Sequence, residues 1–134
     1  MFDRDSFSNE EDYIEFIRVA KDKNFLAITS PCFEVWLLLH QENSVEKIIL
    51  QNYEAILGNC RISNNHSFVS DVTSNILGMN PKRRIPRNFI LNNINVAIER
   101  EKLINNNIFR MFNKVGSNIG SLILEMRDED LKRY

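Results

Sequence analysis

The feature that most constrains the fold is an almost uninterrupted apolar segment at residues 30–40, which contains the only Trp of the 134-residue chain, Trp36. Apolar residues recur at i, i+3 and i+4 from Phe33, and the intervening positions are mostly apolar as well. A helix that is apolar around nearly its whole circumference is buried, so we predict a central core helix. Ser30 and Pro31 predict its start, because Ser is a favoured N-cap and Pro is tolerated in the first turn.

Glu34 is the exception within this segment. A buried carboxylate costs free energy unless it is paired, protonated or bound to a metal ion. One interpretation is a structural pair with a Lys or Arg at the rim of the core. The other is a functional acid, base or metal ligand, because perturbed carboxylates occur at both kinds of position.

The first forty residues predict the order strand, helix, strand, helix. Residues 8–11, Ser-Asn-Glu-Glu, fit a capping box, and a helix over about residues 9–23 follows them. Residues 25–29 form a short apolar run that is typical of a strand buried on both faces. Because a strand–helix–strand unit indicates parallel pairing, we predict an α/β fold with a parallel sheet.

Asp3 and Asp5 precede this helix and lie two positions apart. On a strand, side chains at i and i+2 point to the same side, where these two could reach one divalent cation, or two cations about 4 Å apart. Hard oxygen ligands favour Mg²⁺ or Mn²⁺ over Zn²⁺. The alternative interpretation is an exposed acidic terminal segment.

The rest of the chain is predicted to be mostly helical. A polar loop is expected at residues 59–65, and His66 is expected to be solvated or to cap the helix that follows. We interpret Glu99 to Lys102 as a solvated face and Gly116-Ser117 as the cap of the last helix, before a charged tail. The expected helices cover residues 44–58, 68–78, 88–106 and the stretch after 117.

One basic cluster, within residues 81–87, contains Lys82, Arg83, Arg84 and Arg87. Its prolines place it in a loop. Such cations can bind nucleic-acid phosphates, and each contact adds salt-dependent affinity that does not depend on sequence. No aromatic residue is interleaved, so base stacking is not predicted. The alternative is a solvated charged loop.

Bulk properties exclude little. The 17 basic and 18 acidic residues give a net charge of −1, so composition alone favours neither a nucleic acid nor a membrane as a partner. The longest apolar run, residues 35–39, is too short to span a bilayer. Cys32 and Cys60 lack metal-ligand spacing and indicate reduced thiols in a cytoplasmic protein. The length fits a single domain over residues 1–134.

The Asp3-Arg4-Asp5 element and residues 30–40 together resemble the RloB-like family, in which Asp-Arg-Asp is followed by Ser-(Asn)-Pro-Cys-Phe-Glu-x-Trp-Leu-Leu-Leu-His. This chain lacks the Asn that often stands between Ser30 and Pro31. The resemblance implies a Toprim-related, three-layer parallel α/β fold with a helix-rich C-terminal half. It also implies phosphodiester chemistry with Mg²⁺ or Mn²⁺, an AAA- or ABC-type ATPase partner, and antiviral defence of bacteria by abortive infection.

By this resemblance, Asp3 and Asp5 would bind the metal ion, Glu34 would be a catalytic acid or base or a further ligand, and His40 would pack or orient. The family also carries a strand with an acidic residue before Asp-Arg-Asp. Two strands are marginal as an isolated sheet, so we expect this chain to be the C-terminal portion of an RloB-like domain. Two functions remain open: a metal-dependent nuclease-like protein, or a non-catalytic module that docks on a partner ATPase.

Overall fold

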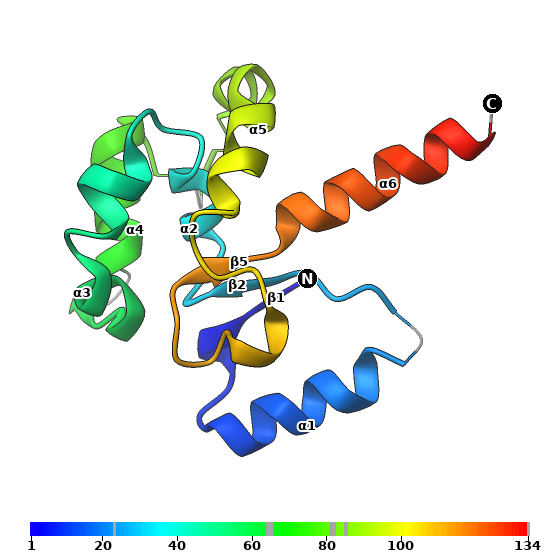
Figure 1. The fold of residues 1–134 in the computed structure, drawn as a ribbon. Coiled ribbons are helices and arrows are strands. Elements are labelled where there is room, and N and C mark those ends of the chain that lie inside the picture. The colour runs from blue at the N-terminus through cyan, green and yellow to red at the C-terminus, as the bar shows by residue number, and fades with distance from the viewer. Residues whose placement is uncertain (23, 64–65, 81–82, 85, 134) are drawn as a thin grey trace.

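Figure 1 shows the fold in a computed structural model, which describes residues 1–22, 24–63, 66–80, 83–84 and 86–133. A small sheet lies at the centre, and the two longest helices belong to the C-terminal half. The elements are β1 (Phe2–Asp3), η1 (Arg4–Ser6), α1 (Glu10–Ala20), β2 (Ile28–Ser30), α2 (Glu34–Leu38), η2 (Val45–Ile49), α3 (Tyr53–Gly58), β3 (Arg61–Ser63), β4 (His66–Ser67), α4 (Phe68–Leu77), α5 (Arg87–Glu101), η3 (Ile108–Arg110), β5 (Gly116–Ser117) and α6 (Ile119–Arg133).

The predicted strand–helix–strand unit at the N-terminus is confirmed. β1 pairs in parallel with β2, so that Asp3 lies opposite Thr29, and α1 connects the two strands. The N-cap of α1 is Asn9, whose side chain accepts a hydrogen bond from the backbone N–H of Asp12 at 2.9 Å. The capping motif therefore begins one residue later than the Ser8 box that the sequence indicated.

The third strand of the sheet corrects the prediction of a wholly parallel sheet. β5 pairs with β2 in the antiparallel direction, with Thr29 opposite Ser117. The prediction of Gly116-Ser117 as a helix cap is corrected here, because these two residues form β5 and α6 begins at Ile119. The α/β class is confirmed, but the sheet is mixed.

The sheet separates two apolar clusters, so the molecule has three layers. Ile28 packs with Tyr13 and Ile17 of α1, whereas the preceding residue, Ala27, packs with Trp36 on the other side. Consecutive strand residues point to opposite faces, and residues 26–30 are all buried. The predicted coverage of this strand on both faces is therefore confirmed, with α1 below the sheet in Figure 1 and the C-terminal helices above it.

The apolar segment forms the predicted core helix, but the helix begins later than expected. Residues 34–40 are all buried. Ser30 ends β2, and its Oγ accepts a hydrogen bond from Arg4 Nε at 3.2 Å, so this hydroxyl does not cap a helix. The Ser30–Pro31 peptide bond is cis, and α2 begins at Glu34.

The predicted polar loop at residues 59–65 contains a strand instead. β3 and β4 pair in the antiparallel direction. The sequence did not indicate them, because short polar strands of this kind lack the alternation that marks a half-buried strand. His66 lies in β4, and the N-cap of α4 is the next residue, Ser67. The end of α4 at Gly78, with φ of 69°, agrees with the prediction.

The predicted solvated face at Glu99 to Lys102 is wrong for Glu101, which is 2% exposed. One of its carboxylate oxygens accepts hydrogen bonds from Ser117 Oγ at 2.8 Å and from the backbone N–H of Gly120 at 2.9 Å. Glu101 thus joins the end of α5 to β5 and the start of α6. Burial, opposed by these hydrogen bonds, raises its pKa.

The predicted charged tail after residue 126 continues the last helix. α6 extends away from the body of the molecule (Figure 1), and Arg127 Nη1 donates to Asn95 Oδ1 of α5 at 3.0 Å. Within the ranges that the structure describes, no helix has the length and apolar character needed to cross a membrane.

Candidate functional site

The predicted metal ligand Asp3 lies at the carboxyl end of β1, next to the end of β2. Thr29 Oγ1 donates to Asp3 Oδ1 at 2.9 Å, and the backbone of Phe33 provides a further hydrogen bond. In α/β sheets, ligands bind beyond the carboxyl ends of parallel strands, so Asp3 occupies the edge of the sheet where a site is expected.

Asp5 does not continue the strand, so the expected i, i+2 geometry on one strand is wrong. It lies in the turn η1, where its backbone N–H donates to the carbonyl of Pro31 at 3.1 Å. Its Oδ2 accepts a hydrogen bond from Asn59 Nδ2 at 3.0 Å. The two carboxylates nevertheless interact, because the charge of Asp5 adds to the effect of burial in raising the pKa of Asp3.

Glu34 lies in the first turn of α2 and is 9% exposed. Its Oε1 accepts a hydrogen bond from Ser70 Oγ of α4 at 3.2 Å. Among the described residues, no Lys or Arg forms an ion pair with Glu34. Within the described ranges the partners of this buried carboxylate are therefore neutral, the Ser70 hydroxyl and the Cys32 thiol, and the rim cation of the structural interpretation is not found there.

The charges of Asp5 and Glu34 both act on Asp3, and we call these three carboxylates the acidic cluster. Burial raises the pKa of Asp3, and the charges of Glu34 and Asp5 raise it further against the hydrogen bond from Thr29. Burial also raises the pKa of the Cys32 thiol far above its usual range, and the same three carboxylates add to this shift. Cys32 is therefore protonated and is no candidate nucleophile.

Arg4, the central residue of the Asp-Arg-Asp element, has a role that the sequence did not reveal. Its guanidinium donates to Ser30 Oγ at 3.2 Å and to the carbonyl of Leu57 at 2.7 Å, and it lies over the ring of Phe112. These hydrogen bonds go to neutral oxygens, not to carboxylates. Arg4 thus connects the first motif to the second and to α3, and its own hydrogen bonds do not reach the acidic carboxylates.

The cluster suits a hard divalent cation that keeps part of its hydration shell. Within the described ranges, no three His, Cys, Asp or Glu side chains converge closely enough to enclose a metal ion by themselves. Mg²⁺, however, is usually bound through one or two carboxylates together with waters and substrate phosphates. Asp3 and Asp5 offer such a pair, and Glu34 adds to the negative charge that a cation would neutralise.

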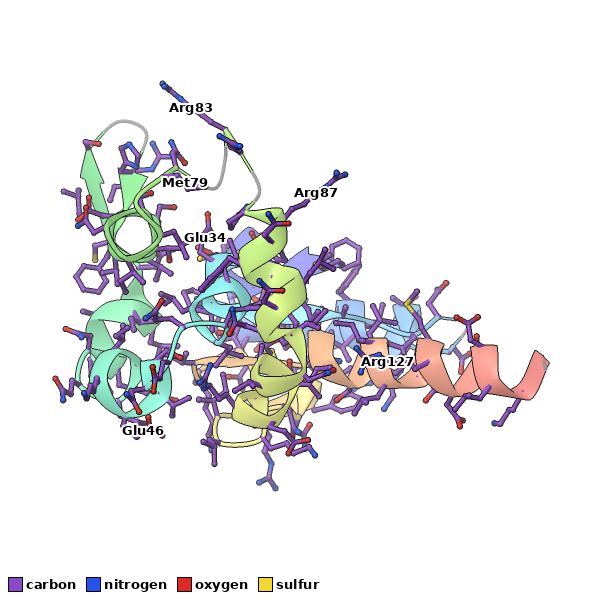
Figure 2. The ribbon with its side chains drawn as sticks, turned by 90° about the horizontal axis from the view of Figure 1, so that it is seen from above. Glu34, Glu46, Met79, Arg83, Arg87 and Arg127 are labelled. Atoms are coloured by element: carbon purple, nitrogen blue, oxygen red, sulfur yellow. The ribbon has the colours of Figure 1, made fainter. Side chains whose placement is uncertain are left out.

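The predicted phosphate-binding residues lie between α4 and α5. Arg83 and Arg84 are exposed in this connection, and Arg87 is the exposed first residue of α5. Figure 2 shows Arg83 and Arg87 projecting away from the body of the molecule. Lys82, the fourth predicted residue, lies outside the described ranges. The connection follows α4, the helix that contacts Glu34 through Ser70.

His40 is buried at the end of the core segment. Its Nδ1 lies 2.9 Å from the carbonyl oxygen of Trp36, and its ring makes an edge contact with the indole. Burial lowers the pKa of His40, which favours the neutral imidazole. This placement agrees with packing, the role expected for His40 from the sequence.

Two residues of the cluster were missed by sequence reasoning, Asn59 and Ser70. Asn59 ends α3 in the left-handed conformation, with φ of 46°. Asn is favoured at such positions, so its conformation was predictable even though its contact with Asp5 was not. Ser70 carries no sequence signal, because its contact with Glu34 joins residues 36 positions apart.

A comparison with protein-family models matches the model for RloB-like protein over residues 1–126. No curated protein and no solved structure matches the chain. The family match contains Asp3, Asp5, Glu34 and the basic cluster, and it covers nearly the whole chain. The chain therefore belongs to the RloB-like family.

Proposed function

We propose that this protein performs Mg²⁺- or Mn²⁺-dependent, nuclease-like phosphodiester chemistry and takes part in bacterial defence against phage. The observation that supports the proposal most strongly is the cluster of Asp3, Asp5 and Glu34. These carboxylates come from β1, η1 and α2, and the charges of Glu34 and Asp5 raise the pKa of Asp3. Like charges held together in this way favour binding of a cation.

Each residue has a separate role in this proposal. Asp3 and Asp5 hold the divalent cation, which when bound supplies polarisation of a phosphate and a lowered pKa for water. Glu34 is a further ligand of this cation through one carboxylate oxygen and accepts the proton of the attacking water through the other, as a general base. The exposed Arg83 and Arg87 bind phosphates that flank the reacting one.

The activity is tested with end-labelled single- and double-stranded DNA and RNA, incubated with Mg²⁺ or Mn²⁺. We expect metal-dependent cleavage by the wild type. Glu34→Gln should cleave about 100-fold more slowly or worse, as is usual when a general base is removed. Glu46→Gln is the matched control, because Glu46 is exposed and lies at the lower left of Figure 2, away from Glu34 near the centre. Equal rates in the two variants would contradict the assignment of Glu34.

Metal binding is tested separately by thermal unfolding. Millimolar Mn²⁺ should raise the melting temperature, because a ligand that binds only the folded state stabilises it. Asp5→Asn should abolish this increase. An unchanged melting curve of the wild-type protein in Mn²⁺ would refute the proposed metal site.

The alternative function, a non-catalytic module that docks on an AAA- or ABC-type ATPase, is favoured by one observation. α6 extends from the body (Figure 1) and exposes Leu124 and Leu131, with fractions of 43% and 77%. If this helix binds the ATPase, Leu124→Lys with Leu131→Lys should abolish copurification of the two proteins and leave the effect of Mn²⁺ on unfolding intact. Retained copurification would refute docking through α6.

A further inference from the structure

Two carboxylates of the acidic cluster are each bound by a side chain from a different part of the chain. Ser70 Oγ donates to Glu34 Oε1 at 3.2 Å, and Asn59 Nδ2 donates to Asp5 Oδ2 at 3.0 Å. Asn59 follows α3 and Ser70 lies in the first turn of α4, so both donors belong to the segment that contains the β3–β4 hairpin. A single structural unit thus contacts carboxylates from η1 and α2.

The amide of Asn59 is fixed from both ends. Its Oδ1 accepts a hydrogen bond from the backbone N–H of Val69 at 3.0 Å, which directs Nδ2 toward Asp5 Oδ2 and, at 3.7 Å, the sulfur of Cys32. The Val69 contact joins Asn59 to α4, one residue before Ser70. The two donors are therefore positioned together, and a shift of α4 would move both.

Ser70 is also strongly constrained. Its side chain is 3% exposed, and its backbone N–H donates to Ser67 Oγ in the N-cap of α4. Glu34 is buried at the other end of the hydrogen bond. A buried hydroxyl bound to a carboxylate restricts the rotation of that carboxylate, because breaking the bond leaves a buried polar group without a partner.

We propose that Asn59 and Ser70 are positioning residues, which orient Asp5 and Glu34 for the divalent cation. This inference rests on the proposed function. Groups that hydrogen-bond to metal ligands fix the direction of the ligand lone pairs, and their loss typically weakens metal binding by about 10- to 100-fold. The α3–α4 segment then determines the affinity of a site whose ligands lie in the N-terminal third of the chain.

Thr73 provides a matched control within the same helix. It lies three positions after Ser70, is fully buried, and its Oγ1 has no hydrogen-bond partner among the described residues. Thr73→Val removes a buried hydroxyl as Ser70→Ala does, but leaves every contact with the carboxylates intact. Any difference between the two variants therefore reports the contact with Glu34 and not the loss of a hydroxyl from α4.

The experiment measures Mn²⁺ affinity from the electron paramagnetic resonance signal of free Mn²⁺, without substrate. Ser70→Ala and Asn59→Gly should each bind Mn²⁺ about 10- to 100-fold more weakly than the wild type, and Thr73→Val should bind it equally well. Glycine is chosen at position 59 because it accepts the left-handed conformation that Asn59 adopts. Asn59→Gly tests the inference independently if Ser70→Ala does not fold.

Wild-type affinity in the folded variants would overturn the inference and leave the metal site standing. Equal weakening in Thr73→Val would also overturn it, because packing of α4 would then explain the effect. If the wild-type protein does not bind Mn²⁺, both the inference and the proposed metal site are refuted. The three results are distinguishable, because the first two differ in the Mn²⁺ affinities of the variants and only the last concerns the wild-type protein.

Discussion

Glu34 and Glu101 are both buried carboxylates in helices, yet their surroundings differ in kind. Glu101 is 2% exposed and accepts hydrogen bonds from Ser117 Oγ and the N–H of Gly120, next to the start of α6. Glu34 is 9% exposed, accepts a hydrogen bond from the Ser70 hydroxyl, and its charge acts on the carboxyl group of Asp3. Burial alone thus does not distinguish these two carboxylates, whereas their hydrogen-bond partners and neighbouring charges do.

The comparison predicts opposite consequences of removing each charge. The Glu101 carboxylate neutralises the unpaired N–H dipoles at the start of a helix, so its loss leaves donors without acceptors. Glu34 adds a negative charge to the cluster that contains Asp3 and Asp5. Its loss therefore relieves repulsion between carboxylates.

The largest expected effect is that of Glu101→Ala on stability. The change leaves the Ser117 hydroxyl and the Gly120 N–H buried without an acceptor, and it opens a cavity. We expect a decrease of about 3 kcal/mol in the free energy of unfolding, measured by denaturant titration in EDTA. A decrease below about 1 kcal/mol would contradict the structural role of Glu101.

The next largest effect is expected for nucleic-acid binding by the basic cluster. Replacing Arg83, Arg84 and Arg87 with Ala should weaken binding to all nucleic-acid sequences alike. The slope of log affinity against log salt concentration should fall by about 2 to 3, since each lost phosphate contact removes slightly less than one unit. Fluorescence anisotropy over a range of salt concentrations measures both quantities.

The control for this prediction carries the same change in net charge at other exposed positions. Lys47, Lys102 and Lys114 are exposed and lie in three different segments. If replacing them with Ala weakens binding as much as the arginine changes do, affinity depends on overall charge and the basic cluster is a solvated loop.

The pH dependence of stability provides a smaller but specific effect at Asp3. Its pKa is raised in the folded protein, so below neutral pH the folded state binds more protons at this position than the unfolded state. Stability in EDTA should therefore increase as the pH falls through this raised pKa, and Asp3→Asn should reduce the increase. Unfolding measured at several pH values, for both proteins, tests this. Identical pH profiles would show that burial and the neighbouring charges do not raise the pKa of Asp3 in the folded protein.

The sequence predicted what depends on strong local patterns. The apolar run at residues 35–39 identified the core helix, and the order of elements around it identified the parallel pairing of β1 and β2. β5 was not predictable, because a Gly-Ser dipeptide becomes a strand only through its pairing with β2. The burial of Glu101 was missed for the same reason, since its partners lie 16 and 19 positions away.

In the candidate site, too, the sequence predicted the residues of local motifs but not their distant contact partners. The Asp-Arg-Asp element and Glu34 were recognisable as sequence motifs, and the structure brings Asp3, Asp5 and Glu34 into one cluster. Their hydrogen-bond partners Asn59 and Ser70 come from distant positions that no local pattern marks. The roles of these residues in metal binding and catalysis stay predictions.

The most direct test of the central claim is thermal unfolding of Glu34→Gln beside the wild type, once in EDTA and once in Mn²⁺. If Glu34 belongs to a metal-binding cluster, the variant should be no less stable than the wild type in EDTA, because repulsion with Asp3 and Asp5 is relieved. The same variant should gain less stability from Mn²⁺. Clear destabilisation in EDTA with an undiminished Mn²⁺ effect would contradict the claim and assign Glu34, like Glu101, to the structural core.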